Sequence, residues 1–301
     1  WEVIVKYHGD LSEVGRQLEA GVEILTQGYG ILTLEESKIP KLSDYSQVEY
    51  IERPKRLGIN LNNSLRESCI TAVQRPPNDL RGQGVLLGII DSGIDYAHPD
   101  FINGDGKSRI LYIWDQTLNG EPPQGFSGGI EFTRKDIDEA LSLSTLMERI
   151  ARVPHKDEIG HGTHVAGIAG GNGRGSNGKY MGVAPESEFI IVKLGRRGTQ
   201  SFPRTTELMR AIKYIVEKAE ELARPIAINI SFGTNEGPHD GNSIVETYMD
   251  EMANRWKSAI VVATGNEGDT GHHTGGLLEE GEEKNIQFIA DEGLTSLTLT
   301  L

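Results

Sequence analysis

Residues 84–95 read GVLLGIIDSGID, and this stretch decides what kind of fold the chain adopts. Val85 to Ile90 is a continuous apolar run, which is typical of a strand covered on both faces. Similar runs occur at 188–194, 225–230 and 259–263, separated by amphipathic helical patterns. Strands that alternate with helices predict an α/β domain on a doubly wound parallel sheet with right-handed crossovers.

Residues 1–58 have a different texture, because short strands and short helices follow one another there. The first seven residues alternate and are rich in β-branched side chains, as in a half-buried strand. The order of elements is β-α-β-β-α-β, which predicts a small α+β unit of ferredoxin-like type. It contains few large apolar residues and would be marginally stable alone.

Three further segments complete the division of the chain. Residues 59–83 are polar and are expected to form a linker. Residues 103–158 interrupt the strand–helix rhythm, and we predict a surface insertion because loops tolerate extra length at small entropic cost. The sheet domain, including this insertion, then spans 84–275. Residues 276–301 are predicted to begin a further β-rich segment.

Composition excludes several classes of function. The 301 residues include 44 acidic and 30 basic side chains, which gives a formal net charge of −14. This charge repels phosphate backbones and anionic lipid, so we expect neither nucleic acid nor a membrane as partner. No apolar run approaches the length of a membrane span. Cys69 is the single cysteine and is interpreted as an incidental thiol, so no disulfide closes within the chain.

Asp91 and His161 are the first candidate site residues. Asp91 follows a buried strand, and sites in open α/β sheets gather at the carboxyl ends of strands. His161 begins the helical pattern HGTHVAGIAG, where the positive end of the helix dipole disfavours the imidazolium. A general base must be unprotonated before it acts, so this position suits one.

A metal site built from His155, His161 and His164 is the competing interpretation of the histidines. The spacing lacks an H-E-x-x-H pattern, and no cysteine or clustered carboxylate completes a ligand set. We therefore predict no metal, and His164 is interpreted as a structural, hydrogen-bonded residue.

Two further motifs end strands. In Asn229–Gly233 (NISFG) the backbone is open to an extended peptide, so Ser231, Phe232 and Gly233 are candidate substrate-binding residues. In ATGNEG, Asn266 follows a glycine and could aim its amide at a developing oxyanion. Taken singly, each motif would be an ordinary strand end or turn.

In this order the motifs resemble those of the subtilases, the subtilisin-like serine proteases of peptidase S8 type. IIDSGID is similar to the family's aspartate motif and GHGTHVAGIAGG to its histidine motif. NISFG is similar to its substrate-binding strand and ATGNEG to its oxyanion motif. The resemblance covers most of residues 84–268. It implies that Asp91 orients His161, that His161 is the general base and that Asn266 is an oxyanion donor.

Residues 1–58 resemble the subtilase propeptide, an intramolecular chaperone and inhibitor whose tail stays bound in the cleft. The resemblance implies self-cleavage between about residues 56 and 71. The family's serine motif, G-T-S-x-[AS], does not occur in residues 1–301, and we expect the serine to lie further along the chain. Calcium is common in the family, but its usual binding loop is not recognisable here, so no cofactor is predicted.

RILYIWDQT (109–117) and the alternating segment after Gly268 resemble the clostridial Csp-type germination proteases. Those proteins carry a jelly-roll insertion before their serine, and the resemblance implies activation of a spore-cortex hydrolase precursor at an extracytoplasmic or spore-associated location. The leading hypothesis is an endopeptidase zymogen that cleaves protein substrates by Asp-His-Ser acyl transfer. The alternative is a pseudoprotease that uses the same fold for binding or signalling.

Overall fold

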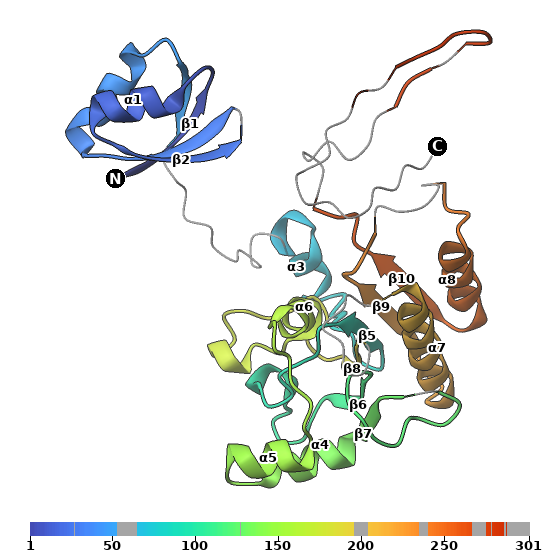
Figure 1. The fold of residues 1–301 in the computed structure, drawn as a ribbon. Coiled ribbons are helices and arrows are strands. Elements are labelled where there is room, and N and C mark those ends of the chain that lie inside the picture. Colours follow the sequence, from blue (N-terminus) through green and yellow to red (C-terminus); the bar gives the residue numbers. More distant parts are fainter. Residues whose placement is uncertain are drawn as a thin grey trace. The chain divides into compact units, whose positions relative to one another are not determined.

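A computed structural model of the chain describes residues 1–26, 28–52, 65–126, 128–195, 204–234, 240–266, 275–277, 279–285 and 287. The chain divides into two units, residues 1–60 and 61–301 (Figure 1). No helix within the described ranges is both long enough and apolar enough to cross a bilayer.

The first unit is a four-stranded antiparallel sheet in the spatial order β2-β3-β1-β4. Val3 and Val5 of β1 are fully buried in one cluster with Leu11 and Val14 of the helix α1. The Asp10 carboxylate caps the N-terminus of α1, because it accepts a hydrogen bond from the backbone N–H of Ser12 at 2.9 Å. The elements are β1 (Glu2–Tyr7), α1 (Leu11–Leu18), β2 (Gly21–Thr26), β3 (Tyr29–Thr33), the 3-10 helix η1 (Glu36–Asp44) and β4 (Val48–Glu52).

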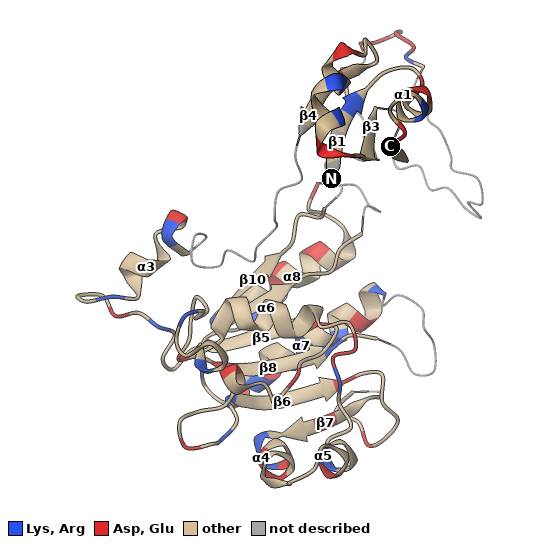
Figure 2. Ribbon diagram, turned by 90° about the vertical axis from the view of Figure 1, so that its left-hand side faces the viewer, with Lys and Arg blue, Asp and Glu red and all other residues tan. Residues whose placement is uncertain are grey.

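The second unit is built on a six-stranded sheet in the order β10-β9-β5-β8-β6-β7. All neighbouring strands are parallel except β6 and β7, which are antiparallel. Figure 2 shows that the strands carry few charged residues. The strands are β5 (Leu86–Asp91), β6 (Ile110–Asp115), β7 (Ile130–Thr133), β8 (Glu188–Lys193), β9 (Ile226–Ile230) and β10 (Ser258–Val262).

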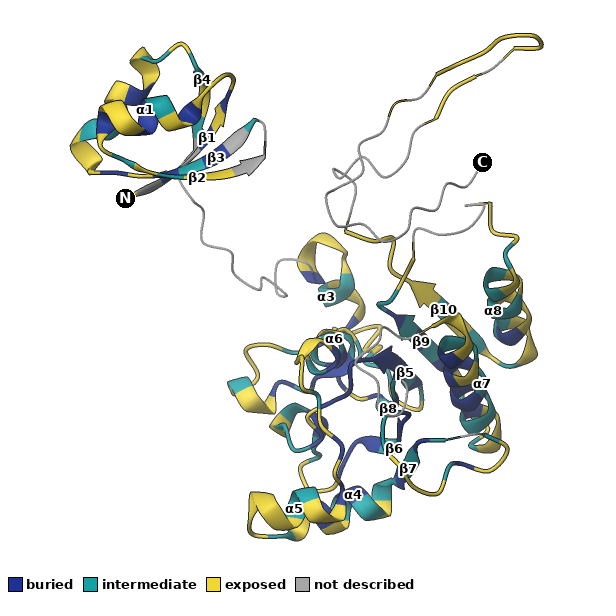
Figure 3. Ribbon diagram, viewed as in Figure 1, coloured by how far each residue is buried: buried dark blue, intermediate teal, exposed yellow. Residues whose placement is uncertain are grey.

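Helices cover both faces of this sheet, because alternate strand residues enter two separate cores. Leu86 and Ile90 of β5 pack in a cluster with α7 and α8, whereas Ile89 packs with α4 and α6. Figure 3 shows buried residues along β5 and on α7. The predicted doubly wound α/β arrangement is confirmed. The helices are α3 (Ile70–Val73), α4 (Arg134–Ser142), α5 (Leu146–Arg152), α6 (His161–Gly170), α7 (Thr205–Glu221) and α8 (Ile244–Arg255), with 3-10 helices η2 (Pro99–Phe101) and η3 (Arg174–Ser176).

The structure differs from the predicted surface insertion at 103–158. Strand β6 lies inside the sheet between β8 and β7, and its Ile113 is fully buried. Ile137 of α4 is also fully buried, in the same cluster. An isolated five-residue apolar run between Gly- and Pro-rich stretches does not reveal its partner strand, and pairing with β8 makes this run part of the core.

Two other predicted segments lie partly outside the described residues. Of the linker 59–83, residues 59–64 are not described, and the same holds for most of the segment 276–301. Further along the linker, Gln74 is 8% exposed, and its side-chain amide donates to the carbonyl oxygens of Gly182 and Val183 at 2.9 and 2.8 Å. Gln74 therefore attaches this part of the linker to the rest of the second unit.

Arg109 fastens the C-terminal end of α6 to the sheet. Its side chain is 2% exposed and donates to the carbonyl oxygens of Gly170, Asp100 and Ser187 at 2.7, 2.8 and 2.5 Å. Burial lowers the pKa of Arg109 to about 10, partly opposed by the negative charges of Asp100 and Glu186. A cation at the end of α6 also complements the negative pole of the helix.

Replacing Ile113 by alanine tests whether β6 belongs to the core. Because the side chain is fully buried, Ile113→Ala should lower the free energy of unfolding by about 2–5 kcal/mol in urea denaturation. Leu146→Ala, at a position 71% exposed on α5, should change it by less than about 0.5 kcal/mol. Equal effects of the two substitutions would mean that β6 does not belong to the core.

Candidate active site

Asp91 is the last residue of β5 and is fully buried. Its side chain lies on the same face of the strand as Ile89, the face that packs against α6. The carboxylate oxygen Oδ1 accepts the backbone N–H of Ser92 at 2.7 Å. The same oxygen lies 2.7 Å from His161 Nδ1, whereas Oδ2 is buried with no hydrogen-bond partner among the described residues.

His161 is the first residue of α6 and follows Gly160, whose φ of 82° lies in the left-handed region. Its imidazole is 50% exposed although its carboxylate partner is 1% exposed. Because a carboxylate only accepts hydrogen bonds, Nδ1 carries the proton and Nε2 is left as an acceptor. The ring is thus held at one nitrogen, with the other available to take up a proton.

The close approach of α6 to the Asp91 turn depends on Gly162. A Cβ added there would lie 2.1 Å from the carbonyl oxygen of Gly93 and 3.0 Å from Asp91 Cβ. Any side chain at this position would push the helix away, and His161 with it. The glycine after the histidine is therefore a packing requirement of the pair.

Asp157 connects the Asp91 turn to the start of α6. Its Oδ1 accepts from Ser92 Oγ at 2.7 Å and from Gly160 N–H at 2.9 Å. Its Oδ2 accepts from the N–H and hydroxyl of Thr163 at 2.8 and 2.6 Å, and Ser92 Oγ accepts from Gly162 N–H at 3.0 Å. Burial raises the pKa of Asp157, but hydrogen bonds from Thr163, Ser92 and Gly160 outweigh it, and the pKa is lowered.

Sequence reasoning did not single out Asp157. The available signal was an acidic residue just before a helix that opens with His161, since carboxylates are favoured at helix N-termini. What the sequence does not reveal is that the same carboxylate also binds Ser92, 65 residues earlier.

Ser231, Phe232 and Gly233, the predicted substrate-binding residues, directly follow β9. Strand β9 is paired on both sides, with β5 and with β10, so it is not an edge strand. Only the residues after Ile230 lie beyond the ladder. The Phe232 side chain packs against the cluster beneath α7 and α8.

Asn266 follows β10 and is exposed, one residue after Gly265, whose φ is 90°. Strands β5, β9 and β10 are parallel neighbours, so their carboxyl ends lie at the same edge of the sheet. Asp91 ends β5, Ser231–Gly233 directly follow β9, and Asn266 lies a few residues after β10. The structure therefore brings these motifs to one edge, as expected for a site in an open α/β sheet.

The histidines do not assemble into a metal site. No group of three or more His, Cys, Asp or Glu side chains within the described ranges could hold a metal ion. His155 is fully buried against Asp115. His164 is exposed and makes no hydrogen bond through its side chain in the part of the chain described, so its predicted structural role is wrong.

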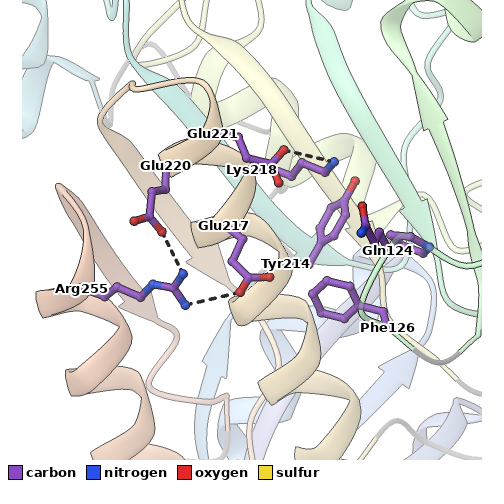
Figure 4. A pocket seen from close by; sticks show the side chains of 9 residues that line it. Gln124, Phe126, Tyr214, Glu217, Lys218, Glu220, Glu221 and Arg255 are labelled. Carbon is purple, nitrogen blue, oxygen red and sulfur yellow. Dashed lines mark hydrogen bonds and ion pairs between the residues drawn. The ribbon is translucent and has the colours of Figure 1, made fainter.

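A surface hollow on α7 does not belong to this site (Figure 4). Phe126 and Tyr214 form its apolar wall, and α7 covers the opposite face of the sheet from α6. Its charges are already paired, because Arg255 binds Glu217 and Glu220 at 3.4 and 2.9 Å. The hollow therefore gives no electrostatic reason to expect a charged ligand.

Comparison with protein families gives two matches. Residues 82–291 match the Subtilase family (Peptidase S8), and residues 1–55 match the Csp protease B prodomain. Among solved structures, the Clostridium perfringens CspB protease is 38% identical in sequence, with a TM-score of 0.64. That similarity covers 72% of this chain and 43% of that chain.

Curated proteins give a consistent result at lower identity. The major intracellular serine protease of Bacillus subtilis (strain 168) is 29% identical over 197 residues, 65% of this chain and 47% of that protein. Serine protease AprX of the same organism is 25% identical over 232 residues, 75% of this chain and 43% of that protein. The chain spans less than half the length of these relatives.

Substituting Asp157 by asparagine should loosen the attachment of α6. Both carboxylate oxygens of Asp157 accept hydrogen bonds, whereas an asparagine amide has only one oxygen that can accept. Asp157→Asn should therefore destabilise the fold by about 1–3 kcal/mol at pH 7. Because the folded pKa is lowered, the wild-type contribution is present above the unfolded value near 4 and is lost as pH falls through the folded pKa. The gap between wild type and variant should therefore shrink toward pH 3.

Urea unfolding at a series of pH values measures this gap. Glu158→Gln is the control, because this neighbouring carboxylate is 76% exposed and the substitution should have little effect at any pH. A gap for Asp157→Asn that does not change with pH would show that the charge of the carboxylate is not what the network uses.

Proposed function

Because the chain belongs to the subtilase family and carries a Csp-type prodomain, we propose that it is part of a subtilisin-type serine endopeptidase made as a self-processing zymogen. The observation that carries the proposal is the 2.7 Å contact between His161 Nδ1 and the buried Asp91 carboxylate. A half-exposed imidazole held in one tautomer by a buried carboxylate is the general base that acyl transfer requires.

In the proposed reaction, His161 Nε2 takes the proton of a serine hydroxyl as its oxygen attacks the peptide carbonyl carbon. Asp91 stabilises the imidazolium that forms, and Asn266 donates a hydrogen bond to the oxyanion of the tetrahedral intermediate. The C–N bond then breaks as His161 returns the proton to the leaving amine. Water repeats the cycle on the acyl-enzyme and releases the second product.

The nucleophilic serine is proposed to lie C-terminal to residue 301. No Gly-Thr-Ser sequence occurs in residues 1–301. The sequence contains Gly-Thr pairs at 162–163, 198–199 and 233–234, and none of them is followed by serine. Residues 1–301 alone would then bind but not hydrolyse a peptide. A pseudoprotease, in which no serine completes the pair, is the competing function that the same observation allows.

The substrate and the inhibitory tail of the first unit are proposed to bind to the same residues. An extended peptide would lie along Ser231–Gly233, the residues that follow β9. The tail of the first unit would occupy this place in the zymogen, and self-cleavage would fall between about residues 56 and 71. The similarity of the prodomain and sheet unit to CspB further supports a role in activating a spore-cortex hydrolase precursor.

The intact mass of the full-length gene product tests self-processing. The wild type should be cleaved between about residues 56 and 71, and His161→Ala should remain whole because it has no base. His164→Ala is the matched control, since that side chain is exposed three residues further along α6 and should be processed normally. If wild type and His161→Ala both stay whole although folded, the pseudoprotease replaces the protease.

Labelling with a fluorophosphonate tests the nucleophile directly. An activated serine forms a stable phosphonate ester, so full-length wild-type protein should be labelled and residues 1–301 should not. Labelling should fall by a factor of about 10³ or more in His161→Ala, because the proton acceptor is lost. Labelling within residues 1–301 would contradict the proposed position of the serine.

A further inference from the structure

A second aspartate–histidine pair lies sealed inside the sheet unit. His155 Nδ1 is 2.7 Å from Asp115 Oδ2, and the two side chains are 0% and 1% exposed. Asp115 ends β6 as Asp91 ends β5, and both residues are in register with Lys193 of the intervening strand β8. The described reaction uses neither member of this buried pair.

Hydrogen bonds determine the tautomer of His155. Asp115 Oδ1 accepts from the N–H and hydroxyl of Thr117 at 3.0 and 2.5 Å, and Oδ2 faces His155. Burial raises the pKa of Asp115, but the bonds from His155 and Thr117 and the charge of Lys193 outweigh it, and the pKa is lowered. The carboxylate therefore accepts from Nδ1–H, and Nε2 presents a lone pair.

That lone pair holds the turn that carries Asp91. Ile94 N–H donates to His155 Nε2 at 3.1 Å, and Ile94 is itself fully buried. Gly93, which precedes Ile94 in this turn, has a φ of 125°, and a Cβ added there would lie 3.2 Å from His155 Cε1. The turn 91–94 is thus held at Ile94 by His155 and at Ser92 by Asp157.

Stability alone does not account for this pair. Burying a carboxylate and an imidazole costs desolvation energy, and well-packed apolar groups of similar volume are often equally stable. What apolar groups cannot supply is an acceptor aimed at one backbone N–H. The specific contribution of the pair is therefore the position of the turn.

We propose that His155 is a positioning residue, whose Nε2 holds Ile94 N–H so that the Asp91 carboxylate stays aimed at His161 Nδ1. Asp115 acts one step further back by fixing the tautomer of His155. The consequence for catalysis rests on the proposed function, but the effect on the Asp91–His161 hydrogen bond does not. The test therefore reads that hydrogen bond directly.

Two amide substitutions separate the two contacts of His155. In His155→Gln, Oε1 can take the place of Nε2 and accept from Ile94. In His155→Asn, Nδ2 can take the place of Nδ1 and donate to Asp115, but the side chain is too short to reach Ile94. The probe is the downfield proton resonance of His161 Nδ1–H in the full-length protein, which reports the hydrogen bond from His161 to Asp91 directly.

The resonance should persist in wild type and in His155→Gln and should be lost in His155→Asn. Val153→Ala, a fully buried position in the neighbouring cluster, controls for general loosening and should retain it. Loss in both His155 variants or in neither, loss only in His155→Gln, or loss in Val153→Ala would overturn the proposal.

Asp115→Asn provides a second route if His155→Asn does not fold. The N–H of Thr117 needs an acceptor, so the amide oxygen of the new side chain would stay beside Thr117 and the amide nitrogen would face His155 Nδ1. Nδ1 would then accept a hydrogen bond and the imidazole proton would move to Nε2. Nε2–H would face Ile94 N–H, and two donors cannot form a hydrogen bond. The His161 resonance should then be lost although His155 is unchanged, and its persistence would overturn the proposal. In the active full-length protease, His155→Asn and Asp115→Asn should each lower kcat by about 10- to 100-fold with little change in KM.

Discussion

A carboxylate that is buried at the end of a central strand must be hydrogen bonded, because an uncompensated charge in the interior costs several kcal/mol. Asp91 is such a group, and its partners are a backbone N–H of its own turn and the imidazole of His161, 70 residues away. The local architecture follows from this requirement. The helix α6 must begin beside the turn, Gly162 must lack a side chain, and Asp157 must connect the two segments.

The sheet unit places the same chemical pair in two environments. Asp91–His161 has an imidazole half open to solvent, so its proton can be exchanged with a reacting group. Asp115–His155 is closed on all sides, and both imidazole nitrogens are occupied. Environment rather than residue type thus separates a pair suited to proton transfer from one suited to holding backbone.

The two faces of the sheet differ in how their helices are held. On the face of α7 and α8, apolar packing predominates and surface charges pair with one another, as Arg255 does with Glu217 and Glu220. On the face of α6, polar side chains hold the two ends of the helix: the buried Arg109 at its C-terminal end and the half-buried Asp157 at its start. Fixing α6 at both ends is what keeps its first residue, His161, in place.

Local sequence was enough to predict strands β5, β8, β9 and β10 of the sheet, the helix beginning at His161 and the motif order that assigns the family. These features depend on residue periodicity and on the residues at element ends, which neighbours in the chain reveal. The core position of β6 and the interior position of β9 were decided only by pairing with distant strands. The contacts of Asp157 with Ser92 and of His155 with Asp115 and Ile94 likewise join segments 40 to 65 residues apart. Such contacts have no local pattern, because a buried polar group can be satisfied by any donor or acceptor that the tertiary fold brings to it.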